Sequence, residues 1–255
     1  MGSAKSAVRV SAETRWEHIA CPICGQDQFR PLFEKQGEPF VQCAGCSLVL
    51  INPRPVYAQV LETYDADYSR SYAAKAVKKR RRVRRWVRHI QRHYAKSGRW
   101  LDVGCSTGFV VEAAHNAGFE AHGIDVETWG VQFAREELGL QNLRIGLLEQ
   151  QDYPAGCFDV ISVYEVIEHV PDLNVFVAAL SRLLAPNGVV EIRTPDVGHW
   201  RVPRRLETWD AIKPSEHLYY FSYATLGRLL ANHGLTVVAR RFNLKPGIKL
   251  IAARP

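Results

Sequence analysis

The stretch that decides the fold is Leu101-Asp102-Val103-Gly104-Cys105-Ser106-Thr107-Gly108-Phe109, an apolar run that meets a glycine turn and then begins a helix. Glycine at 104 lets the backbone approach a ligand, and a helix that opens near Gly108 offers unpaired N–H groups. Asp125 ends the next apolar run, 21 residues after Gly104, where a carboxylate can accept both ribose hydroxyls. The pattern predicts a strand, turn and helix unit that binds a nucleoside.

The spacing of this turn excludes two common nucleotide sites. A dinucleotide fingerprint aligned on Gly104 would need glycines where Ser106 and Phe109 stand. A phosphate-binding loop would need Gly-Lys-Ser/Thr after the turn, and no lysine occurs there. Asp102, beside the turn, suits an ammonium or a sulfonium better than a pyrophosphate. We therefore expect a ligand with a ribose and little or no phosphate.

Further apolar runs alternate with helical segments after this unit. The expected strands are Ala121–Val126, Asn142–Ile145, Phe158–Val163, Val189–Thr194, Thr236–Arg241 and Lys249–Ala253. Their alternation with helices predicts an α/β fold with a doubly wound, seven-stranded, mostly parallel sheet that is covered on both faces. The last two runs are typical of a hairpin that adds an antiparallel edge strand. Ser222 is expected to cap a helix over residues 223–233.

Two segments resemble one protein family. The turn with Asp125 resembles motif I of the class I S-adenosylmethionine-dependent methyltransferases, and residues 158–172, FDVISVYEVIEHVPD, resemble the fourth-strand signature of bacterial small-molecule methyltransferases, including the ubiquinone-biosynthesis O-methyltransferases. The resemblance covers about residues 99–255 and implies a Rossmann-like fold that binds S-adenosylmethionine. With the residues of the turn, the expected cofactor-binding set is Asp102, Gly104, Cys105, Ser106, Gly108, Asp125, Val126, Leu147, Leu148, Tyr164 and Glu165.

Four of the six cysteines form two C-x-x-C pairs, Cys21 with Cys24 and Cys43 with Cys46. Their separation fits a four-cysteine zinc site, and a closed set of four thiolates is structural rather than catalytic. A redox dithiol is the competing interpretation of either pair alone. The apolar residues between the pairs are too few for a core, so the metal is expected to supply folding free energy. The expected order is a flexible N-terminus (1–15), a zinc-ribbon-like module (16–55), a helical basic linker (56–98) and the methyltransferase domain (99–255).

The net charge of +7 is concentrated in one segment, because 12 basic residues and no acidic residue lie between Lys75 and Arg99. This segment is expected to be helical at least from about Ser71, with an apolar stripe of Val83, Trp86, Val87, Ile90 and Tyr94. The helix could bind an anionic partner, which would be RNA, a phosphorylated substrate or an anionic lipid surface, or it could be a solvated helix that packs through its stripe. RNA binding would be lost when Arg80, Arg81, Arg82, Arg84 and Arg85 are neutralised.

Catalytic candidates lie around a polar and aromatic insert from Asp196 to His217. At the carboxyl edge of a parallel sheet such a loop is predicted to be a substrate lid, and its arginines suit an anionic or polyhydroxylated acceptor. A hydroxyl acceptor needs a base, for which His217 and His169 are the candidates, with His217 preferred because it borders the insert. Either histidine could instead make a structural hydrogen bond.

The resulting prediction is a cytoplasmic, S-adenosylmethionine-dependent methyltransferase that modifies a hydroxyl of a sugar, a phenol or a natural-product intermediate. One alternative is an RNA methyltransferase whose zinc module and basic helix bind RNA, and another is a catalytically inactive, zinc-dependent binding module. Tyr164-Glu165-Val166-Ile167 stands where enzymes that methylate amino groups of bases carry Asn/Asp-Pro-Pro-Tyr/Phe, which argues against that chemistry. The sequence has no apolar run of about 18 residues and no apolar start, so neither a transmembrane segment nor a secretion signal is expected.

Overall fold

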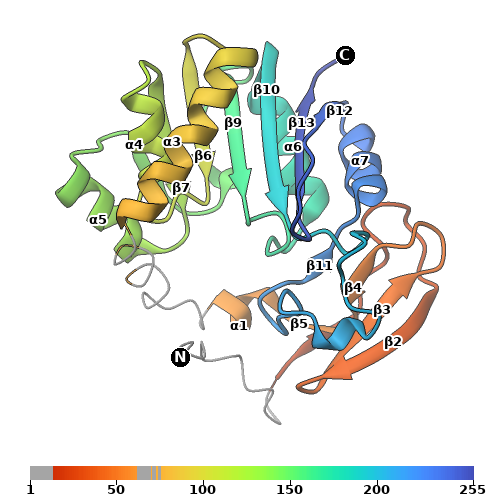
Figure 1. Cartoon of the computed structure of the whole chain (residues 1–255). Coiled ribbons are helices and arrows are strands. Elements are labelled where there is room, and N and C mark those ends of the chain that lie inside the picture. Colours follow the sequence, from red (N-terminus) through yellow and green to blue (C-terminus); the bar gives the residue numbers. More distant parts are fainter. Residues whose placement is uncertain (1–13, 62–69, 71–72, 74–75) are drawn as a thin grey trace.

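The computed structural model describes residues 14–61, 70, 73 and 76–255, and a seven-stranded sheet organises most of them (Figure 1). Its strands are β6 (Arg99–Val103), β7 (Glu120–Asp125), β8 (Leu143–Ile145), β9 (Phe158–Tyr164), β10 (Leu184–Thr194), β12 (Thr236–Arg240) and β13 (Ile248–Ala253). They lie in the order β12-β13-β10-β9-β6-β7-β8, and β8, β7, β6, β9 and β10 are parallel. The predicted doubly wound α/β fold is confirmed. The six strands whose bounds were predicted, β7 to β10, β12 and β13, agree with those predictions within one residue at each end, except that β10 begins earlier than predicted.

The predicted position of the antiparallel strand is wrong. β13 pairs antiparallel with both β10 and β12, so it lies inside the sheet, and β12 forms the edge. A hairpin pattern specifies that two strands pair, but it does not specify which of them faces the rest of the sheet. Apolarity decides this, because Leu250, Ile251 and Ala252 of β13 are fully buried, whereas β12 has exposed residues at alternate positions.

Helices cover both faces of this sheet (Figure 1). One face carries α3 (Ala76–His93), α4 (Phe109–His115) and α5 (Thr128–Leu138), and the other carries α6 (Leu173–Leu183) and α7 (Tyr223–Asn232). Ser222 caps α7 as predicted, since its side chain accepts a hydrogen bond from the N–H of Thr225. None of the helices in the described part of the chain is long and apolar enough to cross a membrane.

The basic segment forms α3, and its predicted apolar stripe is buried at Val83, Val87 and Ile90. Trp86 and Tyr94 of the stripe are half-buried against the same core. The predicted helical residues from Ser71 to Lys75 lie outside the described residues, except for Ala73.

The N-terminal residues build two small sheets. β1 (Trp16–Glu17) pairs with β5 (Arg54–Pro55), while β2 (Phe29–Lys35), β3 (Glu38–Cys43) and β4 (Val49–Ile51) form an antiparallel sheet with β11 (Tyr219–Tyr220) in the order β11-β4-β3-β2. The chain continues from β5 into α1 (Tyr57–Leu61). Short 3₁₀ helices complete the fold, η1 (Leu148–Gln150) after β8 and η2 (Leu206–Thr208) in the insert.

Because β11 comes from the distant C-terminal part of the chain, the cysteine-bearing segment shares its sheet with the larger domain. Phe40 and Ile51 are fully buried in a cluster with Trp209 and Ile212 of the insert. The apolar residues between the cysteine pairs are thus buried in a core that the rest of the molecule completes. The local sequence around the cysteines could not reveal this shared core, because Trp209 and Ile212 lie more than 150 positions away in the chain.

Candidate functional site

The glycine turn between β6 and α4 is held against β7. The N–H of Gly104 donates to the carbonyl of Ile124 at 2.8 Å, and Gly104 has a φ of 75°, in the left-handed region that favours glycine. A Cβ at this position would lie 2.2 Å from Cγ2 of Val166, so the segment after β9 packs directly on the turn. Gly108 has a φ of 73°, and its Cβ would lie 2.7 Å from that of Ala134 on α5. Both predicted glycine positions therefore require glycine.

Asp125, at the end of β7, closes the other side of the turn. One carboxylate oxygen accepts the N–H of Ser106 at 2.7 Å, and the other accepts the N–H of Glu127 at 2.8 Å. These bonds orient the carboxylate, and an ionised carboxylate has further lone pairs for a ligand. The structure thus brings together Gly104, Ser106 and Asp125, which sequence spacing predicted to share one site.

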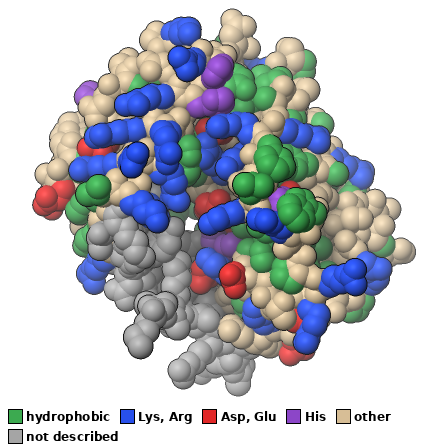
Figure 2. All heavy atoms as spheres, viewed as in Figure 1, with side chains coloured by type: hydrophobic (Ala, Val, Ile, Leu, Met, Phe, Trp, Pro, Cys, Tyr) green, Lys and Arg blue, Asp and Glu red, His purple; other side chains and the backbone are tan. Residues whose placement is uncertain are grey.

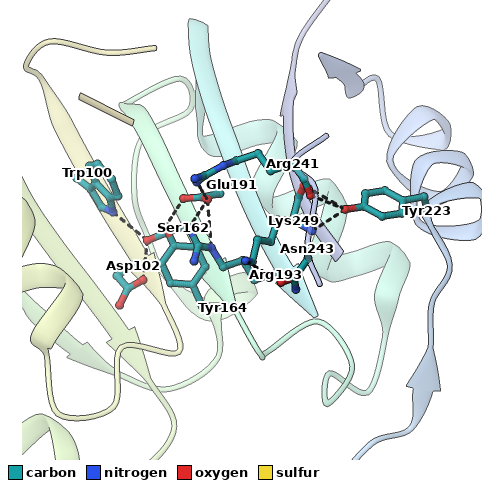
Figure 3. A network of polar contacts seen from close by, with 10 residues as sticks. All are labelled: Trp100, Asp102, Ser162, Tyr164, Glu191, Arg193, Tyr223, Arg241, Asn243 and Lys249. Atoms are coloured by element: carbon teal, nitrogen blue, oxygen red, sulfur yellow. Dashed lines mark hydrogen bonds and ion pairs between the residues drawn. The ribbon is translucent and has the colours of Figure 1, made fainter. Parts of the chain in front are cut away.

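Asp102 lies within a chain of hydrogen bonds on the face of the sheet that carries α3 (Figure 3). Nε1–H of Trp100 donates to Oγ of Ser162 at 2.9 Å, and Ser162 donates to Oδ1 of Asp102 at 2.6 Å. Burial raises the pKa of Asp102 to about 7, because an ionised carboxylate is poorly solvated there. Near pH 7 Asp102 is therefore only partly ionised, and a cation bound next to it would favour the ionised form.

Two further candidates follow one another at the end of β9. The hydroxyl of Tyr164 donates to the carboxylate of Glu191, and the guanidinium of Arg193 lies 4.7 Å from the centre of the Tyr164 ring (Figure 3). Glu165 is exposed with a φ of 57°, and its N–H donates to the carbonyl of Arg193 at 2.7 Å. A left-handed non-glycine residue at this turn is a constrained conformation of the kind that occurs at binding sites.

The remaining predicted cofactor residues differ in how accessible they are. Cys105 is 5% exposed and packs under the turn, and Leu148 is 2% exposed in the core on the opposite side of the sheet. Val126, just after β7, and Leu147, just before η1, are half-buried. Of the two leucines predicted to contact adenine, Leu147 is thus the more accessible.

Tyr57 is a candidate site residue that sequence reasoning missed. It begins α1, which lies beneath the carboxyl ends of the large sheet in Figure 1. Burial and the nearby carboxylates of Glu149 and Asp125 raise the pKa of Tyr57 to about 12, so its hydroxyl is neutral and able to donate. No local pattern marks Tyr57, because only the chain path brings it near enough to feel the charge of a carboxylate 68 residues away.

The predicted catalytic histidines meet face to edge, with ring centres 4.6 Å apart. Nδ1 of His169 lies 2.6 Å from the carbonyl oxygen of Glu216, and since a carbonyl can only accept, Nδ1 carries the proton and Nε2 of the neutral ring has a lone pair. His169 is half-buried, whereas His217 is 4% exposed. The N–H of His169 donates to the carbonyl of Val166, so this turn and the glycine turn contact through one residue.

Glu168 lies beneath the two histidines. It is fully buried, and one of its oxygens accepts the hydroxyl of Thr194 at 2.9 Å. The other oxygen lies 4.0 Å from Nε2 of His169. Burial, followed by the charge of Glu165, raises the pKa of Glu168 to about 8. In Figure 2 the surface is hollowed between the side that carries α3 and the four-stranded sheet that contains β11. Histidine and acidic side chains lie in this hollow.

The insert that was predicted to be a lid is anchored in its second half. Trp209 and Ile212 are buried against β3, β4 and β11, and Nζ of Lys35 donates to the carbonyls of Glu207 and Ile212. Glu38 is fully buried, and it accepts both the N–H and the hydroxyl of Ser215. A movable lid therefore stays a prediction only for the exposed first half, around Trp200, which is 70% exposed.

The two cysteine pairs converge at one end of the four-stranded sheet, where Cys43 ends β3. Sγ of Cys21 lies 3.4 Å from Sγ of Cys46, and Sγ of Cys24 lies 3.4 Å from that of Cys43. All four sulfurs lie within 4.8 Å of one another. Four thiols at this separation can surround one ion at tetrahedral Zn–S distances, so the donor set is compatible with structural zinc.

Comparisons with known proteins agree on the family. A family model described as a methyltransferase domain matches residues 76–240. The ubiquinone biosynthesis O-methyltransferase of Thiobacillus denitrificans is 38% identical over 99 residues, which cover 37% of this chain and 43% of that protein. The enzyme of that name from Rhodopseudomonas palustris is 30% identical over 146 residues, which cover 48% of this chain and 57% of that protein. The chain thus spans about half the length of the curated relatives it matches.

Solved structures confirm the fold. A protein from Pyrococcus horikoshii superposes with a TM-score of 0.58 at 18% identity, covering 69% of this chain and 91% of that one. An S-adenosylmethionine-dependent methyltransferase from Methanosarcina mazei gives a TM-score of 0.55 at 14% identity, covering 65% and 96%. Such identities show the fold alone, but the family match extends over more than half of the chain. The chain therefore belongs to the methyltransferase-domain family, within the class I S-adenosylmethionine-dependent methyltransferases.

Proposed function

We propose that this protein transfers a methyl group from S-adenosylmethionine to a hydroxyl of a small molecule, such as a sugar, a phenol or a natural-product intermediate. The observation that carries the proposal is the contact of the glycine turn with the turn that bears His169, through Val166. This contact supports a methyl-donor pocket that lies next to the turn bearing the proposed base. The names of the relatives, which are O-methyltransferases, support a hydroxyl acceptor.

The residues present fit the cofactor. Gly104 admits a ligand against the backbone, Asp125 offers an oriented carboxylate to ribose hydroxyls, and Asp102 is the proposed counter-charge for the ammonium group. The donor supplies an electrophilic methyl group on a sulfonium. Of the remaining predicted residues, the half-buried Val126 and Leu147 are better placed for contact with the cofactor than the buried Cys105 and Leu148, and Tyr57 is added to the proposed set because the charge of Asp125 acts on its hydroxyl.

His169 is the proposed general base. Because Nδ1 of His169 is hydrogen-bonded to the carbonyl of Glu216, Nε2 is the nitrogen that would take the proton of the acceptor hydroxyl, whose oxygen would receive the methyl group as the neutral thioether leaves. His217, which is more deeply buried, packs edge to face against His169 and keeps its ring in position. The sequence preference for His217 as the base thus gives way to His169 in this proposal.

The four cysteines are proposed to hold a structural zinc ion. Zinc there would stabilise the sheet that contains β11, which begins two residues after His217. The cysteine site and the catalytic turn are thus connected through one small sheet, although the metal itself takes no part in methyl transfer.

The first test is calorimetric titration of the full chain with S-adenosylmethionine. We expect binding, and a loss of tenfold or more on Asp125→Ala, because about 1.4 kcal/mol of hydrogen bonding to the ribose corresponds to that factor. The absence of binding by the parent protein would overturn the proposal and favour an inactive domain.

The second test measures S-adenosylhomocysteine formation with a panel of phenols and sugars, of which catechol is the simplest phenol. His169→Gln is expected to lower kcat by about 10² to 10⁴ and to remove the acidic limb of the pH profile, while cofactor affinity stays unchanged. The matched control is His115→Gln, an exposed histidine on α4. If both variants turn over as fast as the parent, His169 is not the base.

A further inference from the structure

The outward face of α3 carries a straight row of cations. Lys78, Arg81, Arg85, Arg88 and Arg92 recur at intervals of three or four residues, which places them on one side of the helix, opposite buried Val83, Val87 and Ile90. At 1.5 Å per residue the row is about 21 Å long, with about one cation per turn. All five side chains are exposed. We call these five residues the α3 row.

The α3 row has no acidic counterpart in the described part of the chain. Arg80 of the same helix pairs with Glu112 of α4 at 2.9 Å, but none of the ion pairs that the structure describes includes a member of the row. Figure 2 shows Lys and Arg side chains gathered over α3 with few acidic side chains among them. Five like charges along one line repel one another, and a linear polyanion removes that repulsion.

A pocket of about 630 Å³ lies beside the carboxy-terminal half of the row. It is an open depression whose lining has cations, histidines and one amide but no acidic side chain, namely Arg85, Arg88, His89, Gln91, Arg92, His93 and Lys96. The imidazole rings of His89 and His93 lie 4.7 Å apart, and the ring of Tyr94 follows at 6.4 Å from His93. Rings and guanidinium planes beside phosphate-binding cations are the surfaces on which unpaired RNA bases stack.

We propose that α3 is a docking surface for single-stranded RNA, whose phosphates lie along the α3 row and one of whose bases enters the pocket at His89 and His93. An anionic bilayer fits less well, because a membrane-surface helix inserts an apolar face, and the apolar face of α3 is already buried against the sheet. A small phosphorylated molecule would use only part of a row of about 21 Å. This surface is independent of the proposed O-methyltransferase reaction.

The test is fluorescence anisotropy of the full chain with a labelled, mixed-sequence 15-nucleotide RNA at several salt concentrations. Five phosphate contacts predict a slope of about −3.5 in log affinity against log salt, which is a loss of about 50-fold when salt is tripled. Replacing the α3 row by glutamine should lower affinity at least tenfold and bring the slope close to zero. His93→Ala should weaken binding about fivefold without changing the slope, because a stacked ring carries no counterion.

The matched control replaces five exposed cations of other surfaces by glutamine, namely Arg15, Arg30, Arg228, Arg240 and Lys245. It should bind RNA as the parent does, and both multiple variants should keep the parent's circular dichroism spectrum, since every replaced side chain is exposed. Equal losses in the two multiple variants would overturn the proposal. So would binding to phosphatidylglycerol vesicles without binding to RNA, which would identify a lipid surface instead.

Discussion

Replacing Gly104 by alanine tests the contact between the glycine turn and the histidine turn. Two costs are expected. A φ of 75° costs an L-residue about 1 to 2 kcal/mol, and a Cβ placed 2.2 Å from Cγ2 of Val166 overpacks the site by about 1 to 3 kcal/mol. Gly104→Ala should therefore lower the free energy of unfolding by about 2 to 5 kcal/mol, and thermal unfolding should shift by about 2 to 4 °C per kcal/mol in a chain of this size.

The second cost is isolated by a double-mutant cycle with Val166→Ala, which removes the γ-methyl groups that the new Cβ would meet. The double variant should recover the stability that Gly104→Ala loses to overpacking, which gives a coupling free energy of about 1 to 3 kcal/mol. It should still lose the stability that the strained backbone costs. Both quantities come from denaturant unfolding of the four proteins. Calorimetry should show weaker binding of S-adenosylmethionine to Gly104→Ala than to the parent. Additive costs of the two single changes would refute the packing of Val166 on Gly104.

Two further outcomes are expected from the site. The affinity for S-adenosylmethionine should increase as pH rises from 6 to 8 and then level off, because Asp102, with a pKa of about 7, must ionise to oppose the ammonium group. The Asp102→Asn variant should bind S-adenosylmethionine more weakly, and its affinity should be independent of pH. A parallel pH response of the affinity in both proteins would exclude Asp102 as the counter-charge. Cys43→Ser should lose zinc, measured by elemental analysis of the purified protein, and should destabilise β3 and β4 more than Cys157→Ser does; equal zinc content in both variants would exclude the four-cysteine site.

The structure gives one of the five arginines singled out in the sequence a second role. Arg80 belongs to the five residues whose neutralisation was predicted to abolish RNA binding, yet its guanidinium pairs with Glu112 and lies 5.3 Å from the ring of Phe109. Its substitution would loosen α3 from α4 as well as change charge. The α3 row is proposed in place of that set, because its five exposed cations share the side of the helix that lies opposite the buried stripe.

The sequence by itself determined the features that depend on neighbours along the chain. Glycine at 104 and 108, the carboxylate at 125, the paired cysteines and the stripe of α3 each follow from local spacing, since strands and helices repeat with fixed periods and a turn needs its glycines where φ is positive. These features were sufficient to predict the strands of the large sheet and the family.

Only the tertiary structure decided which distant segments meet. It joined β11 to β4, placed β13 inside the sheet, brought Tyr57 close to Asp125 and set His169 against His217. Such contacts depend on which buried surfaces fit one another once all elements are packed, and a local hydrophobic pattern shows that a face is buried without showing what covers it. The glycine turn and the candidate histidines could therefore be predicted from sequence, whereas the contact between the two histidines could not.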